Sequence, residues 1–593
     1  MSNHLALTRA LTELARNQEQ WDAARELGHC VVLAGPGSGK TKTLTTAMAR
    51  ALMDDVIDPR GVACITYNNE CAAELETRLA KFGIRSADRN FIGTVHSFAL
   101  TQVISPYARC IDGLLPQNFG VATYQQTRAA VEVAHKMVFN DEDDPHVRWR
   151  FAEEKRRRDV DRSLPCWRGV NPELANFIEA YEAVLRGGGL IDFDDMPLIA
   201  FRVIKDHQWI RDALRARFPV LFVDEYQDLG HALHELVLLL CFEGGIRLFA
   251  VGDGDQSIYG FTGANPELLQ SLTQRADVRT IRLRFNYRSG SKIIRASLGA
   301  LGEERDYRGI DGAPDGNLNF YAVKGDHSAQ AQYIAAVIVP ALYNSGITFD
   351  QIAILYRAAW LGDKVAEALG DCDLAFVRTD SNALIKRNSP LARFLEDCAS
   401  WVTGGWAKAD PAYSRLLRQA LRIVYGGRYS AAEEQALSLQ LIAFLRSSID
   451  GGETANTWLA RLNNDLIKPW KAVARNSHQE WDVCFELLMR TNPAESKDID
   501  LNVFCGRLEG TGRITLSTLH SAKGREFDAV ILFGINDTDI PSARDKQSAR
   551  SLREARRLFY VGVTRPRKEL CLVYRENHHS PWVAELYSRS QRD

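Results

Sequence analysis

The glycine-rich run Ala34-Gly-Pro-Gly-Ser-Gly-Lys-Thr41 constrains this 593-residue chain more than any other feature. It follows a short apolar stretch, 30–34, and precedes residues 42–52, which have the character of a helix. This order predicts a strand, a phosphate-binding turn and a helix whose N-terminus faces the phosphates. We expect Lys40 to reach the β- and γ-phosphates and Thr41 to bind Mg²⁺. The predicted nucleotide-binding residues of the run are Gly35, Pro36, Gly37, Ser38, Gly39, Lys40, Thr41 and Lys42.

A second run, Val223-Asp-Glu-Tyr-Gln-Asp228, supplies acidic groups. The apolar residues 219–223 suit a buried parallel strand, so Asp224 and Glu225 fall at its carboxyl end, where open α/β sheets bind ligands. We expect Asp224 to hold Mg²⁺ through water and Glu225 to orient or deprotonate the attacking water. The two runs together predict a site that hydrolyses a nucleoside triphosphate.

Composition narrows the class of protein. The chain has 73 basic and 75 acidic residues, which argues against an obligate electrostatic binder but leaves room for a local basic track. Its eleven cysteines include no Cys-x-x-Cys pair, which favours reduced thiols over disulfides or a zinc site. The N-terminal residues lack a signal-peptide core, and apolar runs such as 236–242 are too short to span a bilayer. We therefore expect a soluble, cytoplasmic protein.

The hydrophobic pattern predicts an α/β fold with two lobes, each split by a helical insertion. Between the lobes' strands, residues from about 99 to 191 and from 385 to 508 read as helical. The predicted strand-and-helix units of the first lobe are 30–52, 62–82, 218–242 and 246–274, and the predicted strands of the second are 318–323, 352–356, 514–517, 529–533 and 570–574.

Beyond the two nucleotide runs, further motifs follow in a fixed order and resemble superfamily 1 DNA helicases of the UvrD, Rep and PcrA type. The resemblance extends from about Asn17 to Leu586. The motifs that carry it are 17–20, 66–69 with 72–73, 93–97, 192–195, 224–228, 251–260, 285–289, 517–527 and 560–565. It implies two RecA-like P-loop lobes, 1–98 with 192–287 and 288–384 with 509–593, and helical insertions over 99–191 and 385–508.

The same resemblance implies roles at the nucleotide. Gln20 would read the adenine edge, Tyr287 would stack on the base, and Glu526 would accept from the ribose. Gln256 would link the γ-phosphate to the DNA-contacting residues. Arg288 and Arg565 would point across the cleft between the lobes and stabilise charge during transfer, an effect worth about 10³–10⁵ in rate for an arginine finger.

For DNA contact, the resemblance implies aromatic stacking more than charge. Tyr67, Tyr259 and Phe261 would stack on successive bases, which suits a motor that moves over any sequence. Ordinary core packing is the alternative for each ring, and His96 and His520 could be structural histidines. The remaining predicted DNA contacts are Asn69, His96, Arg357, Thr518 and His520.

These expectations favour an ATP-driven single-stranded DNA translocase and helicase, with 3′-to-5′ direction taken from the resemblance. Its partners would be single-stranded DNA and single/double-strand junctions. The alternative is an ATP-dependent switch or recruitment subunit of a larger complex with a separate nuclease, such as an antiphage assembly. Phe261-Thr262 stands where the family usually has Trp-Arg, which keeps this alternative open. The basic run 155–158 reads as a solvated helix face because acidic residues interleave with it.

Overall fold

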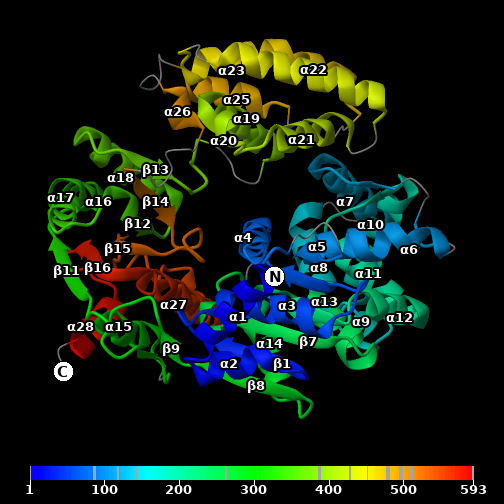
Figure 1. The fold of residues 1–593 in the computed structure, drawn as a ribbon, viewed down its shortest axis with the longest axis horizontal. Coiled ribbons are helices and arrows are strands. Elements are labelled where there is room, and N and C mark those ends of the chain that lie inside the picture. Colours follow the sequence, from blue (N-terminus) through cyan, green and yellow to red (C-terminus); the bar gives the residue numbers. More distant parts are fainter. Residues whose placement is uncertain are drawn as a thin grey trace. The chain divides into compact units, whose positions relative to one another are not determined.

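The computed structural model describes residues 2–84, 89–111, 113–115, 119–139, 143–260, 263–303, 305–384, 389–426, 429–449, 452–475, 481–492, 499–505 and 512–590. The chain forms two compact units. The first comprises Met1–Gly316, Ala543–Thr564 and Ser588–Asp593, and the second comprises Asn317–Ser542 and Arg565–Tyr587 (Figure 1). Each unit contains its own six-stranded parallel sheet, so the predicted α/β class is confirmed. The predicted boundaries of the lobes and insertions stay predictions.

The sheet of the first unit has the strand order β3-β2-β6-β7-β1-β8. Neighbouring residues of its strands face opposite cores: Val31 and Ile65 pack on one side, while Val32 and Cys64 pack on the other. Helices therefore cover both faces, which explains the continuous apolar runs. The strands are β1 (His29–Ala34), β2 (Val62–Thr66), β3 (Phe91–Thr94), β6 (Val220–Val223), β7 (Arg247–Gly252) and β8 (Val278–Leu283).

Two short strand pairs and a set of helices complete the first unit. The pairs are β4 (Gly120–Val121) with β5 (Leu190–Ile191) and β9 (Phe285–Asn286) with β10 (Arg308–Gly309). The principal helices are α1 (Ser2–Leu14), α2 (Gln18–Arg25), α3 (Lys40–Arg50), α4 (Asn69–Ala80), α5 (Val95–Phe98), α11 (Asp195–Asp206), α12 (Gln208–Arg217), α13 (His231–Val237), α14 (Pro266–Thr273), α15 (Ser291–Leu301) and α27 (Ala549–Val563).

The helical segment between β3 and β6 has a small core of its own. Its helices α7 (Tyr124–Val138), α8 (Pro145–Arg158), α9 (Cys166–Gly169) and α10 (Pro172–Gly187) enclose Trp167, Phe177 and Tyr181. The helix starts are encoded locally, because Thr123 forms a capping box with Gln126 and the side chains of Asp144 and Asn171 cap α8 and α10.

The sheet of the second unit has the order β11-β16-β15-β12-β14-β13, with every pair parallel. Its strands are β11 (Asn317–Val323), β12 (Ile352–Tyr356), β13 (Phe376–Arg378), β14 (Ile514–Thr518), β15 (Phe527–Phe533) and β16 (Pro566–Arg575). The helices beside the sheet are α16 (His327–Tyr333), α17 (Val339–Asn344), α18 (Ala359–Asp371) and α28 (Pro581–Ser590). All five strands predicted for this lobe are present.

A second helical core in this unit contains the fully buried Trp458 and Trp470. Its longer helices are α19 (Pro390–Ser400), α21 (Tyr413–Tyr425), α22 (Ala431–Ser448), α23 (Ala455–Leu462), α24 (Lys468–Val473) and α25 (Val483–Arg490). Among the described residues of the whole chain, no helix is long and apolar enough to cross a membrane.

Candidate active site

The glycine-rich loop joins the carboxyl end of β1 to the N-terminus of α3. Gly37 and Gly39 have φ of 68° and 83°, a backbone region that side chains disfavour. The Ser38 hydroxyl donates to the Gly35 carbonyl over 2.7 Å and closes the turn. Glycine is required here because a Cβ on Gly37 would lie 2.4 Å from Asn286 Oδ1 and 2.7 Å from the Cβ of Arg288.

Lys40 identifies the anion site within this loop. Its Nζ is buried and has no hydrogen-bond acceptor among the described residues, and the Glu225 carboxylate lies 3.8 Å away. A buried cation is costly unless it is paired and hydrogen-bonded. The triphosphate of a nucleotide fits this position, since its oxygens would supply the acceptors that Lys40 lacks, and the first helical residues of α3, Lys40, Thr41 and Lys42, place the positive end of the helix dipole at the loop.

Two carboxylates follow β6, at the same edge of the sheet. Burial, followed by the charge of Glu225, raises the pKa of Asp224 to about 7, while Lys40 opposes the shift. A divalent cation bound beside such a carboxyl group would stabilise its ionised form. Glu225 has φ of 49°, uncommon for a residue with a side chain and a form of strain found at functional sites. Asp224, after β6, and the Thr41 hydroxyl, on the second residue of α3, offer the oxygen donors that Mg²⁺ prefers.

A chain of hydrogen bonds leads from Glu225 to Gln256. Gln227 Nε2 donates to Glu225 Oε2 over 2.5 Å, and Gln227 Oε1 accepts from the Asp253 amide over 2.8 Å. Gln256 Nε2 then donates to Asp253 Oδ2 over 2.5 Å. The sequence pointed to Gln256 but missed Gln227, although Gln227 lies within the second acidic run.

Two predicted base-binding residues pack against the loop. Gln20 Nε2 donates to the Ser38 carbonyl over 2.8 Å, so this amide is tied to the phosphate loop; its contact with adenine stays a prediction. The Tyr287 amide donates to the Gly37 carbonyl over 2.8 Å, and its hydroxyl accepts from Asn17 Nδ2 at the same distance. The ring of Tyr287 remains exposed, as a base-stacking residue requires.

The predicted cationic and ribose-binding groups belong to different units. Arg288, in the first unit, follows Tyr287, and its guanidinium donates to the Thr564 carbonyl over 3.4 Å. In the second unit, Arg565 donates to the Arg525 carbonyl over 3.3 Å, and Glu526 accepts from Arg567 over 2.5 Å. Their roles at the nucleotide stay predictions.

The predicted stacking residues Tyr67 and Tyr259 lie against each other. Their ring centroids are 4.7 Å apart and their planes differ by 21°. Tyr67 follows β2 and Tyr259 follows the turn after β7, so the pair lies at the carboxyl edge of the sheet with Asp224. Phe261 and Thr262 lie outside the described residues. Asn69 begins α4, and its side chain is also outside the described part of the chain.

His96 forms a second stacked pair, with Phe193. The ring centroids lie 3.8 Å apart and the planes differ by 22°. Burial lowers the pKa of His96 to about 4, against the opposing charge of Asp194. His96 is therefore neutral at pH 7. Phe193 is 58% exposed and was not among the predicted site residues, although it lies in the motif 192–195.

The predicted DNA contacts of the second unit gather at one sheet edge. Tyr356 at the end of β12 pairs with Thr518 at the end of β14, so Arg357 and His520 each follow the carboxyl end of a neighbouring strand. The Leu519 amide donates to the Tyr356 carbonyl over 2.8 Å and ties the two loops together.

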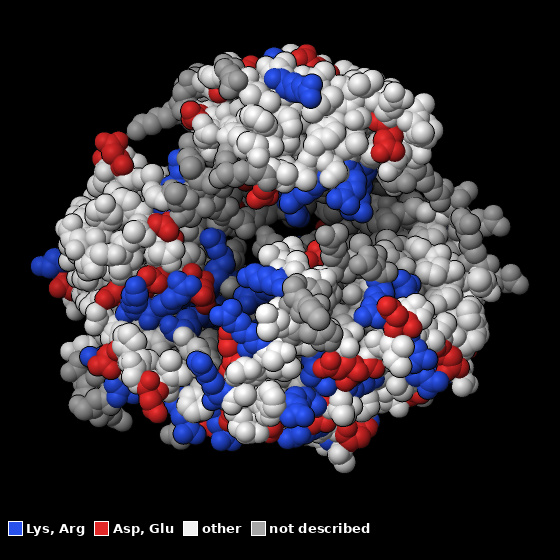
Figure 2. All heavy atoms as spheres, in the orientation of Figure 1, with Lys and Arg blue, Asp and Glu red and all other residues white. Residues whose placement is uncertain are grey.

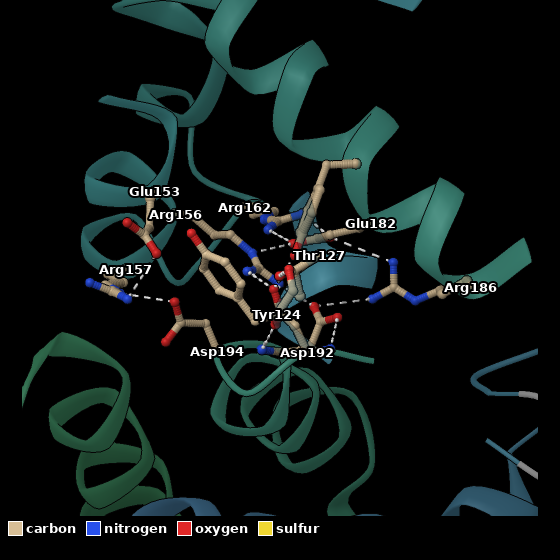
Figure 3. Close-up of polar contacts among 12 residues, drawn as sticks. Tyr124, Thr127, Glu153, Arg156, Arg157, Arg162, Glu182, Arg186, Asp192 and Asp194 are labelled. Atoms are coloured by element: carbon tan, nitrogen blue, oxygen red, sulfur yellow. Dashed lines mark hydrogen bonds and ion pairs between the residues drawn. The ribbon is translucent and has the colours of Figure 1, made fainter. Parts of the chain in front are cut away.

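The basic run 155–158 is only in part the solvated helix face that the sequence indicated, because Lys155 and Arg156 are buried whereas Arg158 is exposed. The Arg156 side chain is only 1% exposed. Its guanidinium donates to Glu182 over 2.9 Å, to Asp192 over 2.7 and 3.0 Å, and to Asp195 over 2.6 Å (Figure 3). Burial opposes ionisation of Asp192, yet Arg156 holds its pKa below the usual range.

Arg156 therefore joins two helices of the helical segment to the motif 192–195. It lies on α8, Glu182 lies on α10, and the two aspartates flank Phe193. Arg157 adds a partly buried contact to Asp194 over 2.9 Å. The loop that presents Phe193 to His96 is thus held by charges from a neighbouring helix.

The fold and the site define a two-unit α/β protein with a P-loop and an acidic pair at the carboxyl edge of its first sheet. A sequence model of the UvrD/REP helicase N-terminal domain matches residues 16–277, and one of the UvrD-like helicase C-terminal domain matches residues 501–577. The chain belongs to the UvrD/Rep helicase family.

Curated relatives extend the similarity over nearly the whole chain. The DNA helicase II of Salmonella typhimurium is 27% identical, over 97% of this chain and 86% of the relative. The ATP-dependent DNA helicase PcrA of Leuconostoc citreum is 25% identical, over 97% and 83%. The ATP-dependent DNA helicase Rep of Buchnera aphidicola subsp. Schizaphis graminum is 24% identical, over 92% and 91%.

The loop geometry predicts the effect of Gly37→Ala. Alanine disfavours the φ of this position, and its Cβ would collide with the Asn286 and Arg288 side chains. We therefore expect nucleotide affinity to fall at least about tenfold, which corresponds to the energy of one strained backbone position. Equilibrium nucleotide binding measures this. Gly169→Ala, where a Cβ meets nothing within 4 Å, is the control. Equal affinities for the two variants would contradict the tight loop.

Arg156→Ala should strongly destabilise the first unit. Removing the cation leaves Glu182, Asp192 and Asp195 buried without it, and breaking a buried pair in this way costs about 3–5 kcal/mol. Chemical denaturation measures the free energy of unfolding. Arg157→Ala, at a side chain 38% exposed, should cost at most about 1 kcal/mol. A similar small cost for both variants would show that Arg156 does not hold the segment together.

Proposed function

We propose that this protein is an ATP-dependent single-stranded DNA translocase and DNA helicase that moves 3′ to 5′ and couples ATP hydrolysis to strand separation. Family membership and relatives named as ATP-dependent DNA helicases support the activity. The direction rests on the resemblance of the motifs. The proposed lobes are 1–98 with 192–287 and 288–384 with 509–593, and the insertions are 99–191 and 385–508.

One observation carries the proposal: a buried lysine that lacks an acceptor lies in a glycine-rich loop, and the acid beside it is hydrogen-bonded through Gln227 to Asp253 and Gln256. Three residues beyond Gln256 comes Tyr259, which stacks on Tyr67. A movement of Glu225 when the γ-phosphate is lost would be passed through these hydrogen bonds to Gln256, and from Gln256 along three residues of backbone to Tyr259. This is the connection that a DNA-coupled ATPase needs.

In the proposed mechanism, Lys40 and the loop amides hold the phosphates. Glu225 orients the attacking water and accepts its proton, and Gln227 fixes the carboxylate in place. Asp224 and Thr41 would hold Mg²⁺, which neutralises charge on the phosphate oxygens when bound. Arg288 and Arg565 would stabilise the charge that develops during transfer.

The DNA strand would pass over the rings at the carboxyl edge of the first sheet. Stacking of bases on aromatic side chains is sequence-tolerant and is worth about 1–3 kcal/mol per base. Tyr67 and Tyr259 would supply such a platform, and Phe261 follows Tyr259 by two residues in the sequence. In the second unit, Arg357, Thr518 and His520 would hold the backbone from the loops after β12 and β14.

Glu225→Gln tests the chemistry. The variant should bind ATP but hydrolyse it at least about 10²-fold more slowly, because the amide cannot accept the proton of water. Steady-state ATP hydrolysis with and without single-stranded DNA measures this. Glu76→Gln, at an exposed position on α4, is the control and should keep normal turnover. Near-normal turnover of the Glu225 variant would overturn the assignment.

Tyr67→Ala tests the platform. We expect single-stranded DNA affinity to fall by about 1–3 kcal/mol, while Tyr67→Phe, which keeps the ring, stays close to the original protein. Fluorescence anisotropy with a labelled oligonucleotide measures the affinity. A core ring cut to alanine would instead cost about 3–5 kcal/mol of stability. A large drop in melting temperature with unchanged affinity would move Tyr67 out of the DNA track.

Strand displacement by the isolated protein separates the proposal from its alternative. Substrates with a 3′ or a 5′ single-stranded tail report the direction, and the helicase should open only the 3′-tailed one. A subunit that acts as an ATP-dependent switch would hydrolyse ATP and open neither substrate.

A further inference from the structure

Helix α27 has a row of arginines along one face. Arg550, Arg553 and Arg557 lie at i, i+3 and i+7, positions that share a face of a helix. Arg550 and Arg553 are exposed and Arg557 is half-buried. We name these three residues the α27 arginine row. Within the described part of the chain, no carboxylate forms an ion pair with any of them.

The run 155–158 differs from the α27 arginine row in this respect. Each of its four basic residues has a carboxylate partner: Lys155 and Arg158 pair with Asp159, Arg156 pairs with Glu182, and Arg157 pairs with Asp194. The surface drawn in Figure 2 likewise has Asp and Glu interspersed with much of its Lys and Arg. In the α27 arginine row, by contrast, three arginines of one helix face have no such partner among the residues that the structure describes.

The row is also unfavourable for the helix that contains it. Like charges at this spacing repel, and a cation in the first turn opposes the helix dipole, yet Arg550 is the second residue of α27. The one acidic residue of the helix, Glu554, lies four residues after Arg550 and three before Arg557, where it offsets part of this repulsion, and it accepts a hydrogen bond from the Gly260 amide over 3.0 Å. An anionic ligand along the row would offset both the repulsion between the arginines and the unfavourable interaction of Arg550 with the helix dipole.

The contact between Glu554 and Gly260 also locates the row. Gly260 directly follows Tyr259 of the stacked pair, and on α27 Glu554 directly follows Arg553. Arg556, on another face, donates to the Ala300 carbonyl over 3.0 Å and fixes α27 on α15. The middle of the row therefore lies close to the segment that follows Tyr259, and both contacts hold α27 in this place.

We propose that the α27 arginine row binds the phosphate backbone of the single DNA strand whose bases stack at Tyr67 and Tyr259. This inference rests on the proposed function for the identity of the ligand. Each arginine would contact one phosphate, and the spacing along a helix face suits successive phosphates of an extended strand. The row would add ionic contacts with phosphates beside a site that otherwise contacts the strand by base stacking.

The test is the salt dependence of binding to a labelled single-stranded oligonucleotide. Each neutralised phosphate contributes about 0.7 to the slope of log K against log salt on single strands. Replacing all three arginines by glutamine should therefore make the slope about 2 less negative, so that the affinity of the variant rises about 10²-fold less than that of the original protein for each tenfold decrease in salt. Replacement by lysine, which keeps the charges, should keep the slope.

The control removes three charges from the other edge of the same sheet. All three control residues are exposed: Arg60 and Arg217 closely precede β2 and β6, and Lys81 follows α4, the helix that returns from the carboxyl end of β2. Their joint replacement by glutamine should leave the slope nearly unchanged. An equal change of the slope in this control would show that the row acts only as part of the general surface charge, and would overturn the proposal.

Other outcomes are equally decisive. An unchanged slope in the glutamine variant overturns the proposal, as does a loss in the lysine variant at normal melting temperature, which would point to packing. A slope lost only on a blunt duplex oligonucleotide would also overturn the assignment to the single strand. If the unaltered protein does not bind single-stranded DNA, the proposed function itself fails, and this result is distinct from all of the others.

Discussion

The buried charge of Lys40 is the constraint on which the first unit depends. An ammonium group without an acceptor is costly, and here it is offset by the carboxylates of Glu225 and Asp224 against the positive end of the α3 dipole. Glu225 lies close enough to attract Lys40 yet too far for a hydrogen bond. Burial, followed by the charge of Glu225, raises the pKa of Asp224, and Lys40 opposes this shift. The neighbouring glycines cannot be replaced without displacing Gln20, Asn286 or Arg288, so the charge and the backbone constrain each other.

Much of this arrangement was predictable from the sequence. The glycine-rich run and the acidic run encode both local structure and chemistry, and the buried strands read as continuous apolar stretches because helices cover both faces. Strands β3, β8 and β13 were missed. Edge strand β8 exposes Arg279 and Thr280 to solvent, and β13 has only three residues, so neither gives a strong hydrophobic signal.

The contacts of charged side chains were not predictable in the same way. The sequence pattern indicated that Arg156 is exposed, because acidic residues close in sequence offset its charge. Its observed partners Glu182, Asp192 and Asp195 instead lie 26 to 39 positions away. A pattern along the chain cannot show which distant carboxylates a fold brings together. Gln227 was missed for the same reason, since its role is defined by the separate segment that contains Asp253.

The depressed pKa of His96 has a consequence for how the proposed strand would be held. A neutral imidazole contributes a ring face and one N–H, and it displaces no condensed cation from nucleic acid. Contact at the pair of His96 and Phe193 would then be nearly indifferent to ionic strength, in contrast to contact through arginines. A protein that combines both kinds of contact would keep part of its affinity for a strand when salt rises. The affinity that remains would come from stacking on bases and not from contact with phosphates.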